Sequence, residues 1–256
     1  MSSSRRLVNQ QTVQSFSNIE VPEKLRTSYD TGWAHMNVLH TGTGIRPSTV
    51  EMITGLPGSG KTTACLQLAD FLVAQGHYVQ YNSCEESAEQ IKMTLERLEL
   101  KNLLDPANSE RAIHSNLCEV GEILAESDKI LAKVPEDKGL FLFVDSLQTI
   151  EKAHEGRGRP AGQQNQSCEA MWDIAEWCKA KYTVAFIIGQ VTKDGTFAGK
   201  QEIKHCVDCH LHLGIDTDKK SDTYNQRIAE QLKNRFGISN LYFSYELTTK
   251  GLVFSD

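Results

Sequence analysis

The segment GLPGSGKT, residues 55 to 62, combines glycines, a lysine and a threonine at the spacing of a phosphate-binding loop, GxxxxGK[ST]. Backbone N–H groups of such a loop surround phosphates at the positive end of the next helix. We expect Lys61 to reach the β- and γ-phosphates and Thr62 to place its hydroxyl on Mg²⁺. A glycine-rich loop without a ligand is the alternative. The predicted nucleotide-binding residues are Gly55, Pro57, Gly58, Ser59, Gly60, Lys61, Thr62 and Thr63.

Acidic residues follow two of the predicted strands. LFLFVD places Asp145 at the carboxyl end of a buried strand, where open α/β sheets bind their ligands. We therefore predict Asp145 with Thr62 as the Mg²⁺ site; a helix-capping aspartate is the alternative. A second strand is followed by CEES, where a carboxylate could orient and deprotonate water for hydrolysis. We favour Glu85 over Glu86 as the catalytic residue, although both acids also suit the first turn of the next helix.

Gln190 closes a third apolar strand, TVAFIIGQ. A neutral amide at that position can form a hydrogen bond with a γ-phosphate. It can thereby transmit the presence or absence of this phosphate to the following loop. A polar residue that simply ends a strand is the alternative.

Alternation of apolar strands and amphipathic helices from residue 50 to residue 190 predicts the elements that position these residues. Apolar runs of this length between such helices are typical of a parallel sheet covered on both faces, a doubly wound α/β fold. After Gln190, strands joined by polar turns without intervening helices predict an antiparallel C-terminal extension. We expect residues 1–47 to form an N-terminal arm or linker and residues 48–256 to form the ATPase core.

Composition narrows the class of protein. The 256 residues carry a net charge of -6, which argues against a generally basic nucleic-acid coat but leaves room for a local basic loop. No apolar run approaches the length of a membrane span and no secretory signal opens the chain, so we expect a soluble, cytoplasmic protein. Seven scattered cysteines indicate reduced thiols. HCVDCH, residues 205 to 210, invites a zinc assignment, but no second ligand pair follows, and we favour a helix that runs into a strand.

LKNRFG, residues 232 to 237, places Lys233 and Arg235 two residues apart, so that both project from one face of a strand. Taken alone, this pattern is typical of a solvated edge strand that ends in a turn.

The order of several segments resembles the ATPase core of the bacterial RadA (Sms) family. The resemblance covers about residues 30 to 254, and KNRFG is its most specific part. The segments that carry it are GLPGSGKTT, YNSCEESAEQIKMTLERL, LFVDSLQTI, VTKDGTFAGKQEIKHCVDCHLHL, LKNRFG and ELTTKGLVF. RadA proteins are RecA-like, DnaB-type hexameric DNA motors of recombination and repair, so the resemblance implies a RecA-like P-loop NTPase fold.

Roles for individual residues follow from the resemblance. It implies that Lys233 and Arg235 reach the nucleotide held by a neighbouring subunit and stabilise charge on the transferring phosphoryl group. Glu85 corresponds to the water-activating glutamate, and Gln190 to the sensor position, where RadA itself more often has a histidine. The implied cofactors are ATP and Mg²⁺, and the implied assembly is a homo-oligomer, expected as a hexamer.

The resemblance also implies single-stranded DNA in a central channel, held by loops after the fourth and fifth core strands. Those loops would be residues 192 to 200 and 216 to 225. Lysines there would contact phosphates, and an aromatic side chain would stack on a base. Ordinary solvated loops are the alternative. The predicted DNA-binding residues are Lys193, Phe197, Lys200, Lys219 and Lys220.

The chain departs from the RadA pattern at both ends. RadA proteins begin with a four-cysteine zinc finger and end with a Lon-protease-like domain, and neither is present here. We expect a core-only form, nucleoid-associated in the cytoplasm, which would suit a compact genome such as a phage's, with recombinase or replication proteins as further partners. Two other classes stay open: a nucleotide-switched loader that binds single-stranded DNA without unwinding it, and a P-loop kinase of small metabolites.

Overall fold

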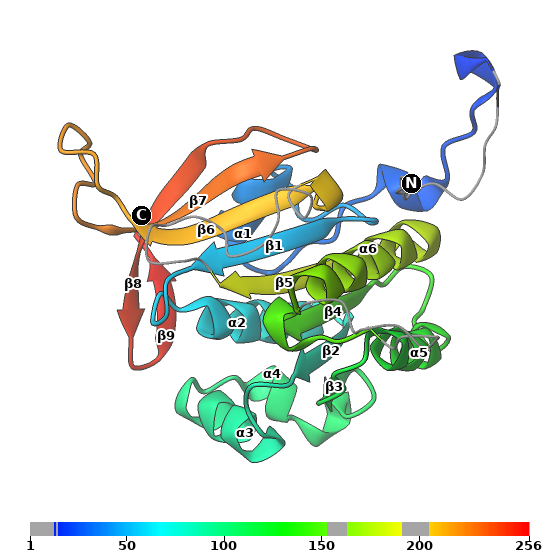
Figure 1. The fold of residues 1–256 in the computed structure, drawn as a ribbon, viewed down its shortest axis with the longest axis horizontal. Coiled ribbons are helices and arrows are strands. Elements are labelled where there is room, and N and C mark those ends of the chain that lie inside the picture. Colours follow the sequence, from blue (N-terminus) through cyan, green and yellow to red (C-terminus); the bar gives the residue numbers. More distant parts are fainter. Residues whose placement is uncertain (1–12, 14, 153–162, 191–204, 256) are drawn as a thin grey trace.

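The computed structural model describes residue 13 and residues 15–152, 163–190 and 205–255 (Figure 1). Strands and helices alternate between residues 50 and 190, as predicted. The α-helices are α1 Ala34–His40, α2 Lys61–Ala74, α3 Ala88–Arg97, α4 Lys101–Leu104, α5 Val120–Leu131 and α6 Gln163–Lys181. The strands are β1 Val50–Gly55, β2 Tyr78–Ser83, β3 Ala112–Ser115, β4 Leu140–Asp145, β5 Val184–Gln190, β6 Cys209–Ile215, β7 Arg227–Asn234, β8 Leu241–Thr248 and β9 Gly251–Phe254.

One nine-stranded sheet joins these strands in the order β3-β2-β4-β5-β1-β6-β7-β8-β9. The pairs from β3 to β6 are parallel, and the pairs β6-β7, β7-β8 and β8-β9 are antiparallel. The predicted α/β fold, a mostly parallel sheet with an antiparallel C-terminal extension, is therefore confirmed. β7 lies between β6 and β8, but the β8 register covers only Ile228–Gln231, so the Lys233 and Asn234 positions of LKNRFG pair with β6.

Helices cover both faces of the sheet, and each face has its own core. β4 contributes to both cores: Phe141 and Phe143 pack with α1 and α2, whereas Leu142 and Val144 pack with α5 and α6. All six residues of β4 are buried. Since successive side chains point to opposite faces, a polar residue within this strand would be buried on either side.

The segment predicted as an arm contributes to the core. Tyr29 and Ile45 exchange backbone hydrogen bonds of 2.8 and 2.9 Å, and Tyr29, Met36, Leu39 and Ile45 are all buried in the cluster beneath α2. The predicted boundary at residue 47 therefore does not coincide with a break in packing. The aromatic and apolar residues of this segment are too widely spaced to give a periodic pattern, which is why the sequence did not reveal its packing.

A buried ion pair joins this segment to β1. His40 Nε2 lies 2.6 Å from Glu51 Oε2, and the two side chains are only 2% and 0% exposed. His40 Nδ1 lies 2.6 Å from the carbonyl oxygen of Met36, and Gln231 Nε2 donates to Glu51 Oε1 at 3.2 Å. Burial lowers the pKa of His40, but the charge and hydrogen bond of Glu51 outweigh it, so that the pKa is raised above its usual value.

Removal of His40 is expected to be strongly destabilising. The variant His40→Ala leaves Glu51 buried without its charge partner, and we expect a loss of about 3–5 kcal/mol in the free energy of unfolding, measured by urea denaturation at neutral pH. His205→Ala, which removes an exposed histidine, is the matched control. An equal effect of the two substitutions would contradict the importance of the pair.

The same pair predicts a pH dependence of stability. A raised pKa in the folded state means that the contribution of His40 is complete below the unfolded pKa of about 6.5 and is lost as pH rises through the folded value. The double variant His40→Gln, Glu51→Gln keeps hydrogen-bonding groups but removes both charges. We expect the wild-type advantage over this variant to shrink as pH rises above the unfolded pKa of about 6.5 and through the raised folded value.

Candidate functional site

The predicted phosphate loop connects the buried strand β1 to helix α2. Gly58 and Gly60 adopt left-handed backbone angles, with φ of 77° and 97°. A Cβ on Gly60 would also lie 2.6 Å from Leu247 Cδ2, so a larger residue would strain the backbone and require Leu247 to shift. The N-cap of α2 supplies no side-chain acceptor. The first N–H groups of the helix therefore remain for a ligand or for solvent.

Lys61 and Ser59 indicate what that ligand would be. Lys61 Nζ donates to the carbonyl oxygens of Gly55 and Leu56 at 2.9 and 3.1 Å, which folds the ammonium over the loop. Burial lowers the pKa of Lys61, with the charges of Asp145 and Glu85 opposing the shift. Ser59 Oγ is buried without a hydrogen-bond partner among the described residues. A cation, an unsatisfied hydroxyl and a helix N-terminus together fit a phosphate group.

Thr62 and Asp145 meet as predicted. Thr62 Oγ1 donates to Asp145 Oδ2 at 2.8 Å, and Tyr81 donates its hydroxyl to the same oxygen at 3.0 Å. Burial raises the pKa of Asp145, and these two hydrogen bonds oppose the shift. The carboxylate therefore faces the phosphate loop and does not cap a helix. Hydroxyl and carboxylate oxygens are the ligands that Mg²⁺ prefers, so the residues present fit this ion.

Glu85 lies next to this pair of residues. Its Oε1 accepts a hydrogen bond from the hydroxyl of Ser146, the residue that directly follows Asp145. Glu85 is exposed, and its charge acts on both Lys61 and Asp145. The start of α3 is capped by Ser87, which forms a capping box with Gln90. The cap of this helix therefore does not depend on Glu85, whose carboxylate lies at the phosphate edge of the sheet.

Other predicted residues are only partly described. Gln190 ends β5 and pairs with Gly55 of β1, so its backbone lies beside the start of the phosphate loop. Lys193, Phe197 and Lys200 lie outside the described residues. Lys219 and Lys220 are exposed in the connection from β6 to β7, which projects from the sheet (Figure 1).

The strand register places Lys233 and Arg235 far from the phosphate loop of their own chain. Gly55 pairs with Leu213 of β6, and Leu213 pairs with Ala229 of β7. β7 is antiparallel and continues from Ala229 to Lys233, which spans roughly 13 Å at the usual rise per residue. The phosphate loop follows the carboxyl end of β1. The two cations therefore lie toward the opposite side of the sheet, where the parallel strands begin.

Both cations are held on that opposite side of the sheet. Lys233 Nζ donates to the carbonyl oxygen of Val207 at 2.7 Å. Arg235, whose side chain is 48% exposed, lies just beyond the end of β7 and forms a 2.9 Å ion pair with Asp208, which is 1% exposed. Asp208 is fixed in turn by Lys179 and by the backbone N–H of Val50.

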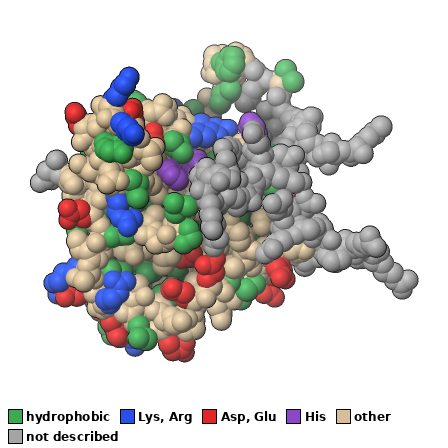
Figure 2. All heavy atoms as spheres, turned by 60° about the vertical axis from the view of Figure 1, so that its left-hand side comes forward, with side chains coloured by type: hydrophobic (Ala, Val, Ile, Leu, Met, Phe, Trp, Pro, Cys, Tyr) green, Lys and Arg blue, Asp and Glu red, His purple; other side chains and the backbone are tan. Residues whose placement is uncertain are grey.

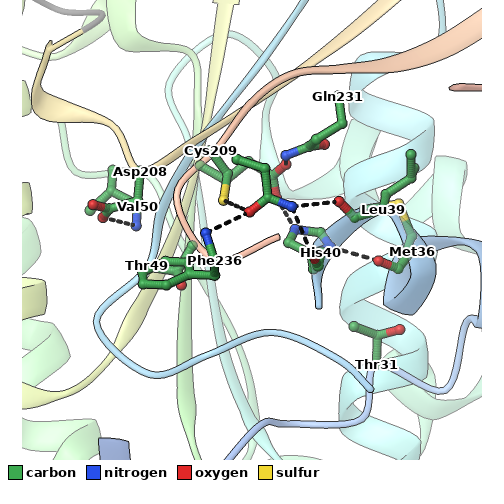
Figure 3. Close-up of polar contacts among 12 residues, drawn as sticks. Thr31, Met36, Leu39, His40, Thr49, Val50, Asp208, Cys209, Gln231 and Phe236 are labelled. Atoms are coloured by element: carbon green, nitrogen blue, oxygen red, sulfur yellow. Dashed lines mark hydrogen bonds and ion pairs between the residues drawn. The ribbon is translucent and has the colours of Figure 1, made fainter. Parts of the chain in front are cut away.

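Asn234, between the two cations, fixes the KNRFG turn to the end of helix α1 through Leu39 and His40, which are labelled with Phe236 in Figure 3. Its Nδ2 donates to the carbonyl oxygens of Leu39 and His40 at 3.1 and 2.6 Å, and its Oδ1 accepts from the backbone N–H of Phe236 at 2.9 Å. A Cβ on Gly237 would lie 2.3 Å from the carbonyl oxygen of His40. Asn234 and Gly237 are thus structural residues that fix the position of the turn next to Lys233 and Arg235.

Several residues at the phosphate edge were not predicted. Tyr245 donates to the carbonyl oxygen of Ser59 at 2.8 Å, and Arg227 donates to that of Gly58 at 3.4 Å. Both residues line a cavity of about 560 Å³ beside the loop, with Gln226, Ser244, Glu246, Leu247 and Ser255. Their β-strand positions carry no motif, and only the pairing of β7 and β8 brings them to the loop.

Two histidines of β6 also lie beside the site. His210 Nε2 and His212 Nδ1 lie 2.7 and 3.0 Å from Thr54 Oγ1. Burial lowers the pKa of His212, and the charge of Lys61 lowers it further. From the sequence, His210 was considered only as part of the HCVDCH zinc alternative, and His212 was assigned no role, because alternating histidines in a strand have no distinctive spacing.

The zinc alternative gains no support. No group of three or more potential metal ligands occurs in the described parts of the chain. Cys206 and Cys209 are buried, and His210 contacts Thr54.

Within residues 15–152, 163–190 and 205–255, no helix has both the length and the apolar character that crossing a bilayer requires.

A phosphate loop between β1 and α2, in a sheet of this order, defines an ATPase domain of the RecA-like fold. A family profile described as "ATPase: KaiC" matches residues 29–254, and the chain belongs to this ATPase family.

Curated relatives agree with the RadA resemblance. The chain is 36% identical over 212 residues to the DNA repair protein RadA of Aquifex aeolicus strain VF5, and 34% identical over 212 residues to that of Campylobacter jejuni. These matches cover 82% and 83% of this chain but 43% of each relative, so the chain spans less than half the length of these proteins.

Solved structures share the fold. One of them, an isolated ATPase domain, superposes with a TM-score of 0.75 at 16% identity, covering 91% of this chain and 93% of that domain. A DnaB-like replicative helicase, studied with its interactions with primase, gives a TM-score of 0.72 at 16% identity and covers 89% of this chain and 62% of that one.

Proposed function

We propose that this ATPase is a ring-forming motor that binds single-stranded DNA and promotes branch migration or unwinding in recombination and repair. One observation carries the proposal: the phosphate loop and the Lys233–Arg235 pair occupy opposite edges of one sheet. A cation pair so placed cannot complete the nucleotide site of its own chain. In a head-to-tail assembly, one surface of each subunit contacts a different surface of the next. The proposal places the surface that carries Lys233 and Arg235 against the phosphate loop of the neighbouring subunit.

Each site residue then has a defined task in ATP hydrolysis. Lys61 neutralises charge on the β- and γ-phosphates, and Thr62 with Asp145 would hold Mg²⁺, which offsets phosphate charge when bound. Glu85 orients the attacking water and takes its proton.

Two further groups sense and complete the reaction. Gln190 senses the γ-phosphate at the end of β5. Lys233 and Arg235 of the neighbouring subunit stabilise the transferring phosphoryl group. The cavity lined by Arg227 and Tyr245 is the proposed site of the base and ribose, because Tyr245 is hydrogen-bonded to Ser59 of the phosphate loop.

Single-stranded DNA is the proposed partner inside the ring. The net charge is -6, and Figure 2 shows basic and acidic side chains mixed on one face, with acidic ones gathered in its lower part. A general basic surface is therefore absent from the described residues on that face. Binding would depend on local loops repeated around the ring, such as the β6–β7 connection with Lys219 and Lys220.

Removal of these two lysines tests the DNA site. Lys219→Ala with Lys220→Ala is expected to weaken binding to all single-stranded sequences and to reduce the salt dependence of log K by about 1.4 for each contacting subunit. Fluorescence anisotropy with a labelled oligonucleotide over a salt series measures both. Lys92→Ala with Lys129→Ala, which removes equal charge from exposed helical positions, is the control. An unchanged salt slope in the first variant would exclude this loop from the DNA contact.

Unwinding is tested with a fluorescent fork in the presence of ATP and Mg²⁺. The proposal expects phosphate release to rise with single-stranded DNA and the fork to be separated in one preferred direction. ATP turnover without strand displacement would favour the alternative function, a nucleotide-switched loader. The relatives named as RadA and the DnaB-like fold support DNA as the substrate in either case. Recombinase or replication proteins are the expected further partners.

A further inference from the structure

Two cysteines lie in contact beside the proposed catalytic glutamate. Cys84 directly precedes Glu85, at the end of β2, and Cys118 lies in the loop between β3 and α5. Their Sγ atoms are 2.8 Å apart. The other five cysteines of the chain are buried, whereas Cys118 is exposed and Cys84 is half-buried. An oxidant in solution therefore meets this pair before any other thiol.

A network of hydrogen bonds holds the two backbones that carry these thiols. Asn82 Nδ2 donates to the carbonyl oxygen of Leu117 at 2.8 Å, and Asn82 Oδ1 accepts from the N–H of Leu117 at 3.1 Å. The carbonyl oxygen of Cys118 accepts from the N–H of Glu151 at 2.7 Å, and the N–H of Cys84 donates to the carbonyl oxygen of Asp145 at 3.2 Å. The pair is thus preorganised by neighbouring elements and is not a chance encounter of two mobile side chains.

We propose that Cys84 and Cys118 form a reversible disulfide under oxidising conditions, and that this bond stops ATP hydrolysis by displacing Glu85. The second half rests on the proposed role of Glu85 in activating water. The bond would tie the residue before Glu85 to the residue before Glu119, the N-cap of α5. Catalytic geometry is sensitive to small shifts, since displacement of a reacting group by about 1 Å can lower a rate by a factor of about 10².

Hydrogen peroxide is the oxidant that balances the reaction. The exposed Cys118 attacks one peroxide oxygen, the O–O bond breaks, and a sulfenic acid and one water form. Cys84 then loses its proton and attacks that sulfur as the thiolate; the S–O bond breaks, and the departing hydroxyl takes up a proton and leaves as a second water. In total two thiols and one peroxide give one disulfide and two waters. Dithiothreitol reverses the change by two successive thiol–disulfide exchanges and is itself oxidised.

Peptide mapping by mass spectrometry tests the bond itself, without any assay of activity. Protein treated with a small excess of peroxide and then alkylated is expected to yield a cross-linked peptide that joins Cys84 to Cys118. The cross-link should disappear after dithiothreitol. A treated protein in which both cysteines are alkylated, or are oxidised without being joined, would overturn the proposal.

ATP hydrolysis by the same samples tests the consequence. We expect oxidation to reduce kcat at least tenfold, with recovery after dithiothreitol. The variant Cys118→Ser should hydrolyse ATP normally when reduced and should resist peroxide, while circular dichroism confirms its fold. Full activity of the cross-linked wild type would overturn the regulatory half. If the reduced wild type hydrolysed no ATP, the proposed function would fail, while the peptide map would still decide whether the bond forms.

Discussion

Replacement of Lys61 by alanine is expected to abolish ATP turnover, with a loss of at least about 10³-fold in kcat/KM. The ammonium already lies over the phosphate loop, bonded to the carbonyl oxygens of Gly55 and Leu56. Charge placed in advance where phosphate charge must be stabilised contributes most of such a rate enhancement, and each factor of ten corresponds to about 1.4 kcal/mol. Filter binding of labelled ATP and phosphate release measure binding and turnover separately.

The fold is expected to survive this substitution. Burial lowers the pKa of Lys61, which means that the folded protein disfavours its charge. Lys92→Ala, an exposed lysine on α3, is the control for loss of one positive charge. Unchanged ATP turnover in a folded Lys61→Ala protein would show that residues 55 to 62 do not form the nucleotide site.

The sequence was sufficient for those parts of the site that are local in the chain. The phosphate loop needs only glycine, lysine and threonine at fixed spacing between a strand and a helix, and β1 and α2 occupy that place. Asp145 was predictable because a wholly apolar strand ends in an acid, and parallel strands bring their carboxyl ends to one edge. Its contact with Thr62 follows from this topology.

Contacts that depend on the pairing of strands far apart in the chain could not be predicted from the sequence. Asp208 anchors Arg235 because β6 and β7 pair antiparallel, and nothing in HCVDCH distinguishes a buried anchor from a metal ligand. Arg227 and Tyr245 reach the phosphate loop only through the pairing of β7 with its neighbours. Such contacts join residues that lie far apart in the chain, for which a single sequence has no periodic signal.

The second large effect on ATP hydrolysis is expected for Arg235, which lies on the opposite side of the sheet from Lys61. Arg235→Ala is expected to bind ATP nearly as well as the wild type but to lose about 10³- to 10⁵-fold in kcat, as when an arginine finger is removed. Asp208 keeps Lys179 and the N–H of Val50 as partners, so the fold should tolerate the change. Arg26→Ala, an exposed arginine whose ion pair with Glu23 is 4.0 Å long, is the control.

Mixing the two inactive proteins separates action between subunits from action within one chain. The Arg235→Ala subunit has an intact Lys61, and the Lys61→Ala subunit has an intact Arg235, so a complete site forms only where they adjoin in the right order. In rings mixed at random in equal amounts, about a quarter of the interfaces would be complete, and phosphate release should recover to at most about that fraction. Native mass spectrometry establishes that mixed rings are present. If such rings hydrolyse no ATP, then Arg235 acts within its own chain, where it contacts Asp208, and the interfacial site is excluded. If Arg235→Ala alone is fully active, then Arg235 is not needed for hydrolysis in either chain, and the interfacial site is excluded as well.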